Sequence, residues 1–299
     1  SCEKLDIRDR IVILTATSGD TGKAALEGFR DVEGTKIIVF YPEKGVSDIQ
    51  RAQMVTQAGR NVLVCAIDGN FDDAQTGVKA VFADDLAHHW SAERSARLSS
   101  ANSINLGRLV PQVAYYFKAY VDLVLTGEIT LGNKIDFVVP TGNFGDILAG
   151  EFARRMGLPI GTLVCASNAN NVLTDFIRTG VYDRRRDFHR TISPSMDILV
   201  SSNLERYLYL ASDGDTQLVS MLMRELSEKG FYQAPESLME VLRKTFSAYC
   251  VTDDETRKTI KDVWEQRGYL LDPHTAVAWT AMEAYRAETG AERQTIVLA

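Results

Sequence analysis

The sequence predicts an α/β protein in which parallel-rich sheets are flanked by helices. Two observations lead to this fold class. Short runs of apolar, β-branched residues recur along the chain, and the segments between them carry apolar side chains at helical spacing. Strands that alternate with helices of this length pair in parallel, and helices then cover both faces of the sheet. The length of 299 residues is sufficient for two such domains.

Three strands are predicted in the first part of the chain, over residues 11–15, 35–40 and 61–67. Between the second and third strands, a helix begins at Ser47, which is a typical cap, and ends at Gly59. The next helix is predicted from apolar residues at helical spacing, namely Phe71, Ala74, Val78, Val81 and Phe82. Residues 83–100 are polar and irregular, so we expect an exposed connection there.

A long helix is predicted over residues 108–124. Its apolar residues share one face: Leu109, Val113, Tyr116, Phe117, Tyr120 and Val124. We interpret this aromatic stripe as core packing rather than as a binding surface. Strands follow at residues 135–139 and 162–166, and the helix between them ends near Met156.

The C-terminal part of the chain, from Leu204 onward, is predicted to be mostly helical. Thr252 and Glu255 have the spacing of a capping box, which is a structural signal without functional weight. Residues 294–299 have the composition of a strand. Because a globular domain rarely ends within a strand, we expect the sequence to be incomplete at this end.

The composition excludes several classes of function. Forty acidic side chains and 33 basic ones give a net charge of −7, which argues against a general nucleic-acid binder. No apolar run approaches the roughly 18 residues that a membrane span needs, and the N-terminus is too polar for a signal peptide. We therefore expect a cytoplasmic protein without a nucleic-acid or membrane partner. The oligomeric state is not predicted.

The cysteines and histidines do not suggest a disulfide or a metal site. The four cysteines lie far apart in the sequence: Cys2, Cys65, Cys165 and Cys250. They form no C-x-x-C pair, so we expect buried or idle thiols in a reducing compartment. His88, His89 and His189 lack partners at metal-ligand spacing, and we assign no metal.

The first candidate site is the string T-A-T-S-G-D-T-G at residues 15–22, which follows a strand and opens a helix. We expect the amides of its central residues to point outward: Ser18, Gly19, Asp20 and Thr21. A helix N-terminus carries unsatisfied amides and a partial positive charge, and it therefore attracts carboxylates and phosphates. The alternative is that Ser18 or Asp20 only caps the helix and Gly19 makes the turn.

The second candidate is a glycine-containing loop, T-G-N-F-G-D at residues 141–146, which also lies between a strand and a helix. Gly142 and Gly145 let the backbone approach an anion closely, and the helix start supplies a favourable field. The string is not G-x-G-x-x-G, so a dinucleotide is not expected. A tight turn without a ligand is the alternative. Since this loop and the first one both end parallel strands, they are expected at the ligand-binding edge, where they would hold two anionic groups.

The third candidate, A-N-S-I-N-L-G-R at residues 101–108, places polar side chains and a cation just ahead of a helix. A guanidinium such as that of Arg108 can bind an oxyanion through two donors. The alternative is a loop in which Asn105 only caps its helix.

The fourth candidate, D-P-H-T-A at residues 272–276, again opens a helix, with Pro273 at its first position. His274 could bind a ligand or transfer a proton near neutral pH. The alternative is a structural histidine, which is the more frequent role of a lone histidine.

Taken together, these strings resemble the threonine synthase family of pyridoxal-phosphate (PLP) enzymes, which have the two-domain tryptophan-synthase-β-like fold (PLP fold type II). The matching strings are T-A-T-S-G-D-T-G at residues 15–22, S-A-N-S-I-N at 100–105, P-T-G-N-F-G-D at 140–146 and D-P-H-T-A at 272–276. They occur in family order and cover most of the chain, and G-N-F-G is the form of the longer bacterial and fungal branch. The resemblance implies a smaller domain over residues 1–125 with substrate-side loops, and a larger domain over 126–299 with the cofactor-phosphate loop.

The resemblance also implies a reaction and a set of site residues. The reaction converts O-phospho-L-homoserine and water to L-threonine and phosphate by β,γ-elimination and replacement, with pyridoxal 5′-phosphate as the electron sink. The implied cofactor-binding residues are Gly142, Asn143, Phe144, Gly145 and Asp146. The implied substrate-binding residues are Ser18, Gly19, Asp20, Thr21, Asn102, Ser103, Asn105, Arg108, His274 and Thr275. We expect the site in a cleft between the domains, which would close on substrate.

The sequence departs from the family at the residue that joins the cofactor. Family members use a Lys in an F-K-D context upstream of S-G-D-T-G, and no such string occurs here. The single Lys ahead of the motif is Lys4, in the context C-E-K-L-D. The Ser or Thr expected opposite the pyridine nitrogen would lie beyond Ala299. We therefore expect a chain truncated at both ends, without its Schiff-base lysine and inactive as given, from an active parent.

Two alternative functions stay open. Another amino-acid lyase of PLP fold type II, such as a threonine dehydratase, would keep the fold and change the reaction. The strings S-G-D-T-G and G-N-F-G-D count against it. Members that resemble dehydratases have the string S-x-N-x-x-Q and a glycine-richer phosphate loop at these places. A non-catalytic anion-binding homologue would account for the missing lysine.

Overall fold

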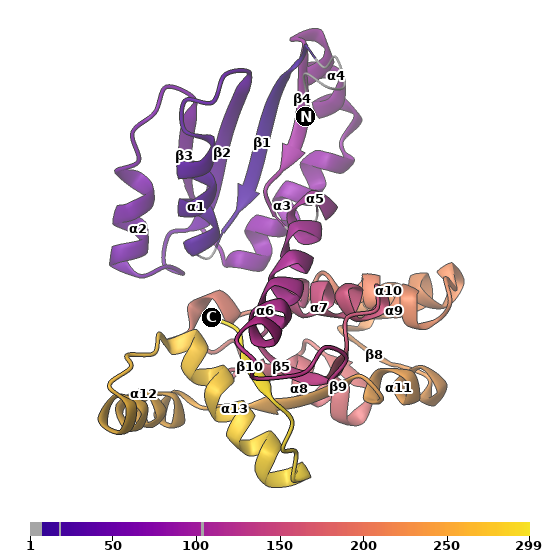
Figure 1. Cartoon of the computed structure of the whole chain (residues 1–299). Helices are drawn as coiled ribbons and strands as arrows, with labels where there is room; N and C mark the ends of the chain where they lie inside the picture. Colours follow the sequence, from indigo (N-terminus) through magenta and orange to yellow (C-terminus); the bar gives the residue numbers. More distant parts are fainter. Residues whose placement is uncertain (1–7, 18, 103–104) are drawn as a thin grey trace. The chain divides into compact units, whose positions relative to one another are not determined.

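The computed structural model describes residues 8–17, 19–102 and 105–299, and its contacts divide the chain into two compact units (Figure 1). Unit 1 comprises Ser1–Arg108 and unit 2 comprises Leu109–Ala299. Each unit is built on a four-stranded sheet whose strands all pair in parallel. The predicted α/β class, with parallel sheets flanked by helices, is therefore confirmed.

The sheet of unit 1 has the strand order β3-β2-β1-β4. Its strands are β1 Arg10–Ala16, β2 Thr35–Pro42, β3 Val62–Ile67 and β4 Ala96–Ser100. Successive residues of β1 face opposite sides of the sheet. Ile13 packs with Leu26 and Met54 on one side, whereas Leu14 packs with Val78 on the other. Both faces are thus buried, and the three strands predicted in this part of the chain are confirmed.

The helices described within this unit are α1 Asp20–Phe29, α2 Asp48–Val55, α3 Phe71–Ala83 and α4 Asp85–Glu93. The core clusters place α1 and α2 on one face of the sheet and α3 on the other. Ser47 caps α2 by accepting a hydrogen bond from the amide of Gln50, as predicted. The helix ends at Val55, earlier than the predicted end at Gly59, and Thr56 closes its last turn by donating its hydroxyl to the Ala52 carbonyl.

The prediction of an exposed connection over residues 83–100 is wrong. This stretch contains α4 and β4, and β4 pairs with β1 in parallel. Asp84 caps α4 by accepting hydrogen bonds from the amides of Leu86 and Ala87. The helix buries little besides Ser91, and β4 is a polar edge strand. Neither element therefore produces the apolar periodicity on which the prediction relied.

The parallel sheet of unit 2 has the order β10-β5-β6-β9. Its strands are β5 Ile135–Pro140, β6 Ile160–Ser167, β9 Phe246–Cys250 and β10 Thr295–Val297, and a separate antiparallel pair consists of β7 Val181–Asp183 and β8 Phe231–Gln233. In β5, Phe137 faces the larger core and Val138 faces the smaller core beneath the C-terminal helix. The strands predicted at residues 135–139, 162–166 and within 294–299 are confirmed. The sequence analysis does not predict β7, β8 or β9.

Helices cover both faces of this second sheet. They are α6 Val113–Leu125, α7 Gly145–Arg155, α8 Val172–Thr179, α9 Leu204–Ala211, α10 Thr216–Lys229, α11 Glu236–Arg243, α12 Asp253–Arg267 and α13 Pro273–Thr289. Tyr116 of α6 is fully buried, and its ring centroid lies 4.8 Å from that of Phe137. The interpretation of the aromatic stripe as core packing is confirmed. Across the described residues, no helix has the length and apolar character that a membrane crossing would require.

The helix predicted over residues 108–124 is divided in the structure. The short helix α5, Leu106–Leu109, is followed by a 3-10 turn, η2 at Val110–Gln112, and only then by α6. Pro111 has no amide hydrogen and interrupts the helical hydrogen bonding. Because α6 packs on α7, the contact boundary between the units lies after Arg108, whereas the boundary based on sequence is near residue 125.

The cysteines among the described residues are free thiols. Cys165 is buried in β6, and burial raises the pKa of its thiol to about 12, so the thiol is neutral at physiological pH. Cys65 is half-buried and Cys250 is exposed. Cys2 lies outside the described residues. The prediction of a buried thiol is thus confirmed for Cys165.

Two helical glycines provide a matched test of the packing. In α7, a Cβ on Gly150 would lie 2.6 Å from Cε1 of the buried Tyr116 ring, whereas a Cβ on Gly77 in α3 would meet nothing within 4 Å. We expect Gly150→Ala to lower the free energy of unfolding by about 1–3 kcal/mol through overpacking. Gly77→Ala should raise it by about 0.5–1 kcal/mol through helix propensity. Urea unfolding measures both, and a neutral Gly150→Ala would contradict the described contact between α6 and α7.

The capping box of α12 provides a pH-dependent test. Glu255 accepts hydrogen bonds from the Thr252 amide (2.8 Å) and hydroxyl (2.7 Å), and these bonds lower the pKa of its carboxyl below the ordinary 4.5. The resulting stabilisation is present above the unfolded pKa and is lost as the pH falls through the lower folded pKa. We expect Glu255→Ala to cost about 0.5 kcal/mol at pH 7, because the group is exposed, and less near pH 3. Glu265→Ala on the same helix is the control. A cost that does not depend on pH would refute the assigned charge effect.

Candidate functional site

The four candidate strings come together as two pairs. In unit 1, β1 and β4 are parallel neighbours, so the strings that follow them lie at the same edge of the sheet. In unit 2, the loop after β5 and the start of α13 both pack against residues 195–196. The carboxyl edge of an open parallel sheet is the usual position for a ligand. Each unit therefore gathers two strings that are far apart in the sequence.

Thr17 holds the turn between β1 and α1. Its Oγ1 accepts hydrogen bonds from the amides of Gly19 (2.9 Å) and Gly22 (2.8 Å). The Gly19 amide is therefore turned inward, not outward as the sequence analysis expects. Gly19 has a φ of 143° and immediately precedes α1, which fits the alternative that it makes the turn. Sequence reasoning missed Thr17, although a Thr two residues before a Gly at a strand end is a recognisable turn signal.

Asn102 joins the first and third strings. Its Oδ1 accepts a hydrogen bond from the Ala16 amide (2.7 Å), and its Nδ2 donates to the Ala16 carbonyl (2.6 Å). Both residues are buried. The Asn102 side chain thus extends the pairing of β1 beyond the last residue of β4. This arrangement uses both ends of the amide for backbone contacts, so Asn102 holds the edge of the sheet.

The remaining residues of the third string have different surroundings. Asn105 accepts a hydrogen bond from the Gly107 amide (2.9 Å) and donates to the Ser100 carbonyl (3.0 Å), which confirms its capping role. Arg108 is exposed, and within the described part of the chain it forms no ion pair. Its guanidinium is therefore available to an anion.

Three predicted substrate-binding residues are described only in part or not at all. Ser18 and Ser103 lie outside the described residues. Asp20 is described only as the first residue of α1, and Thr21 follows it in the first turn of that helix. Their proposed contacts with substrate stay predictions.

The loop between β5 and α7 is a tight turn built on Asn143 and Phe144. The Asn143 Oδ1 accepts a hydrogen bond from the Gly145 amide (2.9 Å). Phe144 has a φ of 62°, in the left-handed region, and its side chain is fully buried with ring centroids 5.9 Å from Tyr207 and 5.4 Å from Phe246. Packing in the core therefore stabilises a backbone conformation that a non-glycine residue rarely adopts. Only the backbone of Phe144 can contact a ligand.

A second segment, residues 201–203, binds two backbone carbonyls of this loop. The Ser201 hydroxyl donates a hydrogen bond to the Gly142 carbonyl (2.6 Å). Asn203 donates two hydrogen bonds to the Asn143 carbonyl, one from its backbone nitrogen (3.0 Å) and one from its side-chain Nδ2 (3.1 Å). Sequence reasoning missed Ser201 and Asn203, since they lie about sixty residues from the loop in a stretch without periodicity. The run of small polar residues at positions 201–203 was the available signal.

His274 binds backbone on one side and a carboxylate on the other. Its Nε2 accepts a hydrogen bond from the Ser195 amide (3.2 Å), so the proton of the neutral ring is on Nδ1, which lies 3.3 Å from Asp272 Oδ1. Asp272 also caps α13 through the amides of His274 and Thr275, and it accepts a hydrogen bond from the Thr275 hydroxyl. His274 thus links the start of α13 to residues 195–196, which back Gly142. These contacts favour the alternative that the His274 ring has a structural role.

A buried polar network follows β6, and sequence reasoning missed it as well. Asn168 Nδ2 and Asn170 Nδ2 donate to Asp197 Oδ1 (2.8 and 3.0 Å), and the Thr191 amide donates to Asp197 Oδ2 (3.0 Å). Burial raises the pKa of the Asp197 carboxyl, and the hydrogen bonds from Thr191 and Asn168 oppose this effect. The network fixes the segment 191–197, whose last residues support the glycine loop.

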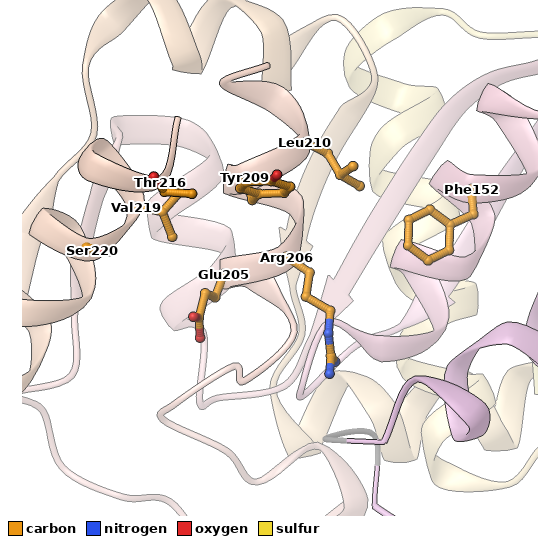
Figure 2. Close-up of a pocket in the computed structure, with 8 residues that line it drawn as sticks. All are labelled: Phe152, Glu205, Arg206, Tyr209, Leu210, Thr216, Val219 and Ser220. Atoms are coloured by element: carbon orange, nitrogen blue, oxygen red, sulfur yellow. The ribbon is translucent and has the colours of Figure 1, made fainter. Parts of the chain in front are cut away.

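Among the cavities in the described residues, one of about 360 Å³ lies between α7, α9 and α10. Figure 2 shows its lining, which includes the aromatic and apolar side chains of Phe152, Tyr209 and Leu210, with Arg206 between Glu205 and Phe152 in this view. None of the predicted site residues lines it. Arg206 connects it to the glycine loop, because its guanidinium donates a hydrogen bond to Asn203 Oδ1. Burial lowers the pKa of Arg206.

The fold, and a glycine loop that leads into the start of a helix at the end of a parallel strand, are features of a phosphate-bearing cofactor enzyme. Consistent with this, the profile of the family described as "Pyridoxal-phosphate dependent enzyme" matches residues 2–299. The chain therefore belongs to the family of pyridoxal-phosphate-dependent enzymes, and the fold is PLP fold type II, as predicted. Serine racemase from Dictyostelium discoideum shares only the fold, with 15% identity and a TM-score of 0.54, covering 96% of this chain and 75% of that chain.

Within this family, the chain is similar to threonine synthases. It is 41% identical to threonine synthase from Pseudomonas aeruginosa, covering 93% of this chain and 57% of the relative. The PLP-bound threonine synthase from Brucella melitensis has 40% identity and a TM-score of 0.84, covering all of this chain and 61% of that chain. Human threonine synthase-like 1 is 46% identical over 89% of this chain and 37% of the relative. The chain thus spans between about a third and three fifths of these relatives.

The residues at the start of α7 fit the cofactor phosphate. The helix has 11 residues, and its N-cap residue, Phe144, contributes no side-chain cap. A helix start of this kind offers amide donors and a positive field to a phosphate. A Cβ on Gly142 would lie 3.0 Å from Ile198 Cδ1, so the loop has no room for a side chain there. The Ser202 hydroxyl is buried and lacks a hydrogen-bond partner among the described residues, between two residues that bind the loop.

The role of Asn102 can be tested through stability. We expect Asn102→Ala to lower the free energy of unfolding by about 2–3 kcal/mol, because it leaves the buried amide and carbonyl of Ala16 without partners. Asn105→Ala, at an exposed neighbour with two backbone hydrogen bonds, should cost less than about 1 kcal/mol. Denaturant unfolding of both variants measures the difference. Equal costs would show that Asn102 does not hold the sheet edge.

Proposed function

We propose that the protein carrying this chain is a threonine synthase, which converts O-phospho-L-homoserine and water to L-threonine and phosphate. The main support is the identity of 41% to the Pseudomonas aeruginosa threonine synthase over 93% of the chain. The four motif strings lie within the region that matches. We further propose a cytoplasmic location, which rests on the composition, and a small-molecule substrate, which rests on the similarity to threonine synthases.

In this proposal, residues 142–146 hold the cofactor phosphate. Gly142 and Gly145 allow the close approach, and the start of α7 supplies amide donors and the positive end of the helix dipole. Phe144 acts through its backbone, because its ring belongs to the core. The bound cofactor supplies an electron sink for charge at Cα and Cβ of the substrate, which permits loss of phosphate from Cγ and addition of water at Cβ.

The residues of unit 1 and of α13 are proposed to serve the substrate. The turn at residues 18–21 would meet the substrate carboxylate or the cofactor ring, and Arg108 would bind the substrate phosphate through a charge-assisted pair. Asn102 holds the adjacent sheet edge, and Asn105 shapes the turn before Arg108. His274 and Thr275 hold the start of α13 behind the glycine loop.

The lysine that joins the cofactor is not assigned in this chain. The family's F-K-D context does not occur in residues 1–299, and Lys4 stands in a different context. We propose that the polypeptide as printed does not catalyse the reaction, although its parent protein does.

Activity measurements test both statements. We expect the whole gene product containing these residues to release one phosphate for each threonine formed from O-phospho-L-homoserine. The polypeptide of residues 1–299, incubated with pyridoxal phosphate, should form no borohydride-reducible lysine adduct by mass spectrometry and no threonine. A reducible adduct on any lysine would overturn the proposed inactivity. A whole protein that leaves O-phospho-L-homoserine unchanged would overturn the proposed reaction.

A second candidate is a related amino-acid lyase of the same family. The identity of 46% to threonine synthase-like 1, a name that does not state a reaction, exceeds the identity to the threonine synthases above. In the same assay, release of a 2-oxo acid from threonine or serine would favour this candidate. Cofactor binding without turnover of any of these substrates would favour the non-catalytic homologue.

A further inference from the structure

We propose, on the basis of the function proposed above, that Ser201 and Asn203 are positioning residues that hold the glycine loop in its phosphate-binding conformation. They are not among the motif strings, and they reach the loop from the segment before α9. Their proposed task is to orient peptide planes, so that amide hydrogens of the loop face the cofactor phosphate.

The orientation follows from which backbone atoms are bound. Ser201 binds the carbonyl oxygen of Gly142, and Asn203 binds the carbonyl oxygen of Asn143 with two donors. In a trans peptide unit, the carbonyl and the amide hydrogen of the next residue point in opposite directions. Binding the Asn143 carbonyl on one side therefore directs the Phe144 amide hydrogen to the other. Successive amides that converge in this way form a concave anion site.

The core keeps both positioning residues in place. The Ser201 amide donates to the Tyr182 hydroxyl (2.7 Å), which itself donates to the Leu199 carbonyl (3.0 Å). Tyr182 is fully buried and stacks on Tyr232 with ring centroids 5.3 Å apart and an interplanar angle of 7°. We call Ser201 and Asn203 together the clamp. The stacked rings of Tyr182 and Tyr232 thus hold the Ser201 part of the clamp in place.

The amide of Asn203 has a defined orientation. Asn203 is fully buried, and its Oδ1 accepts a hydrogen bond from the Arg206 guanidinium. The oxygen therefore faces Arg206, and Nδ2 faces the Asn143 carbonyl. An aspartate at this position would keep the partner for Arg206 but would place a carboxylate oxygen against a carbonyl oxygen. This asymmetry makes Asn203→Asp a specific test, because it removes one donor with almost no change in volume.

The test compares ligands with and without a phosphate. We measure the dissociation constants of pyridoxal 5′-phosphate and pyridoxal by tryptophan fluorescence, and that of inorganic phosphate by calorimetry. The proteins are residues 1–299 and its variants Asn203→Asp, Ser201→Ala and Ser201→Thr. Ser212→Ala is the matched control, because this hydroxyl also donates to a carbonyl in the same unit, that of Tyr209. Thermal unfolding verifies that each variant is folded.

We expect Asn203→Asp and Ser201→Ala to weaken binding of pyridoxal 5′-phosphate about three- to tenfold, the value of one hydrogen bond, and to leave pyridoxal binding unchanged. Ser201→Thr keeps the hydroxyl donor and should restore wild-type affinity, and Ser212→Ala should have no effect. Unchanged affinity for pyridoxal 5′-phosphate in both variants would overturn the inference. An equal loss for pyridoxal would also overturn it, because the effect would then not concern the phosphate.

Amide hydrogen exchange separates this inference from the proposed function. If the wild-type chain binds neither pyridoxal 5′-phosphate nor inorganic phosphate, the cofactor site proposed for this chain fails. The clamp is then tested by exchange at residues 142–145, which we expect to accelerate several-fold in Asn203→Asp and Ser201→Ala but not in Ser212→Ala. Unchanged exchange in both variants would overturn the clamp, whatever the ligand result.

Discussion

Parallel strand pairing is the constraint on which the rest of the structure depends, since it brings the ends of distant strands to a single edge. Each strand must return through a crossover, so the turns after β1 and β4 become neighbours although 86 residues separate Ala16 from Asn102. The register that pairs Leu14 with Ser100 determines where these turns meet. In unit 2, the same geometry places the loop after β5 beside the polar network that follows β6.

Near these edges, polar side chains mainly satisfy backbone groups of strand ends, turns and helix starts. Thr17 binds two amides, Asn102 binds an amide and a carbonyl, and His274 binds the Ser195 amide. A buried backbone group without a partner costs free energy, so such side chains are needed wherever a strand ends inside the protein. A polar motif at a strand end can therefore act by shaping the backbone, and the backbone then presents the donors that a ligand uses.

The parts of the fold that the sequence predicts are those in which burial produces a periodic pattern. β1 and β5 are buried on both faces, and they appear as continuous apolar runs. β4 and α4 are polar and partly exposed, so their periodicity is weak, and only Pro111 indicates the division of the helix that follows. The glycine loop is recognisable because its residues are contiguous. The residues that hold it are not, since Asn203 meets Asn143 only through the packing of α9 and the aromatic core.

The three-residue strand β10 determines when β5 gains its second described neighbour in the sheet. Thr295–Val297 pairs with Asp136–Val138 of β5, so the central strand waits for a partner that is synthesised about 160 residues later. The four described strands of unit 1, in contrast, have been synthesised once residue 100 has been made. On the ribosome, unit 1 can fold early, while one flank of β5 stays open until residues 295–297 have emerged. During that interval the unpaired edge of β5 can pair with a strand of another chain, so the nascent chain then depends most on protection from such pairing.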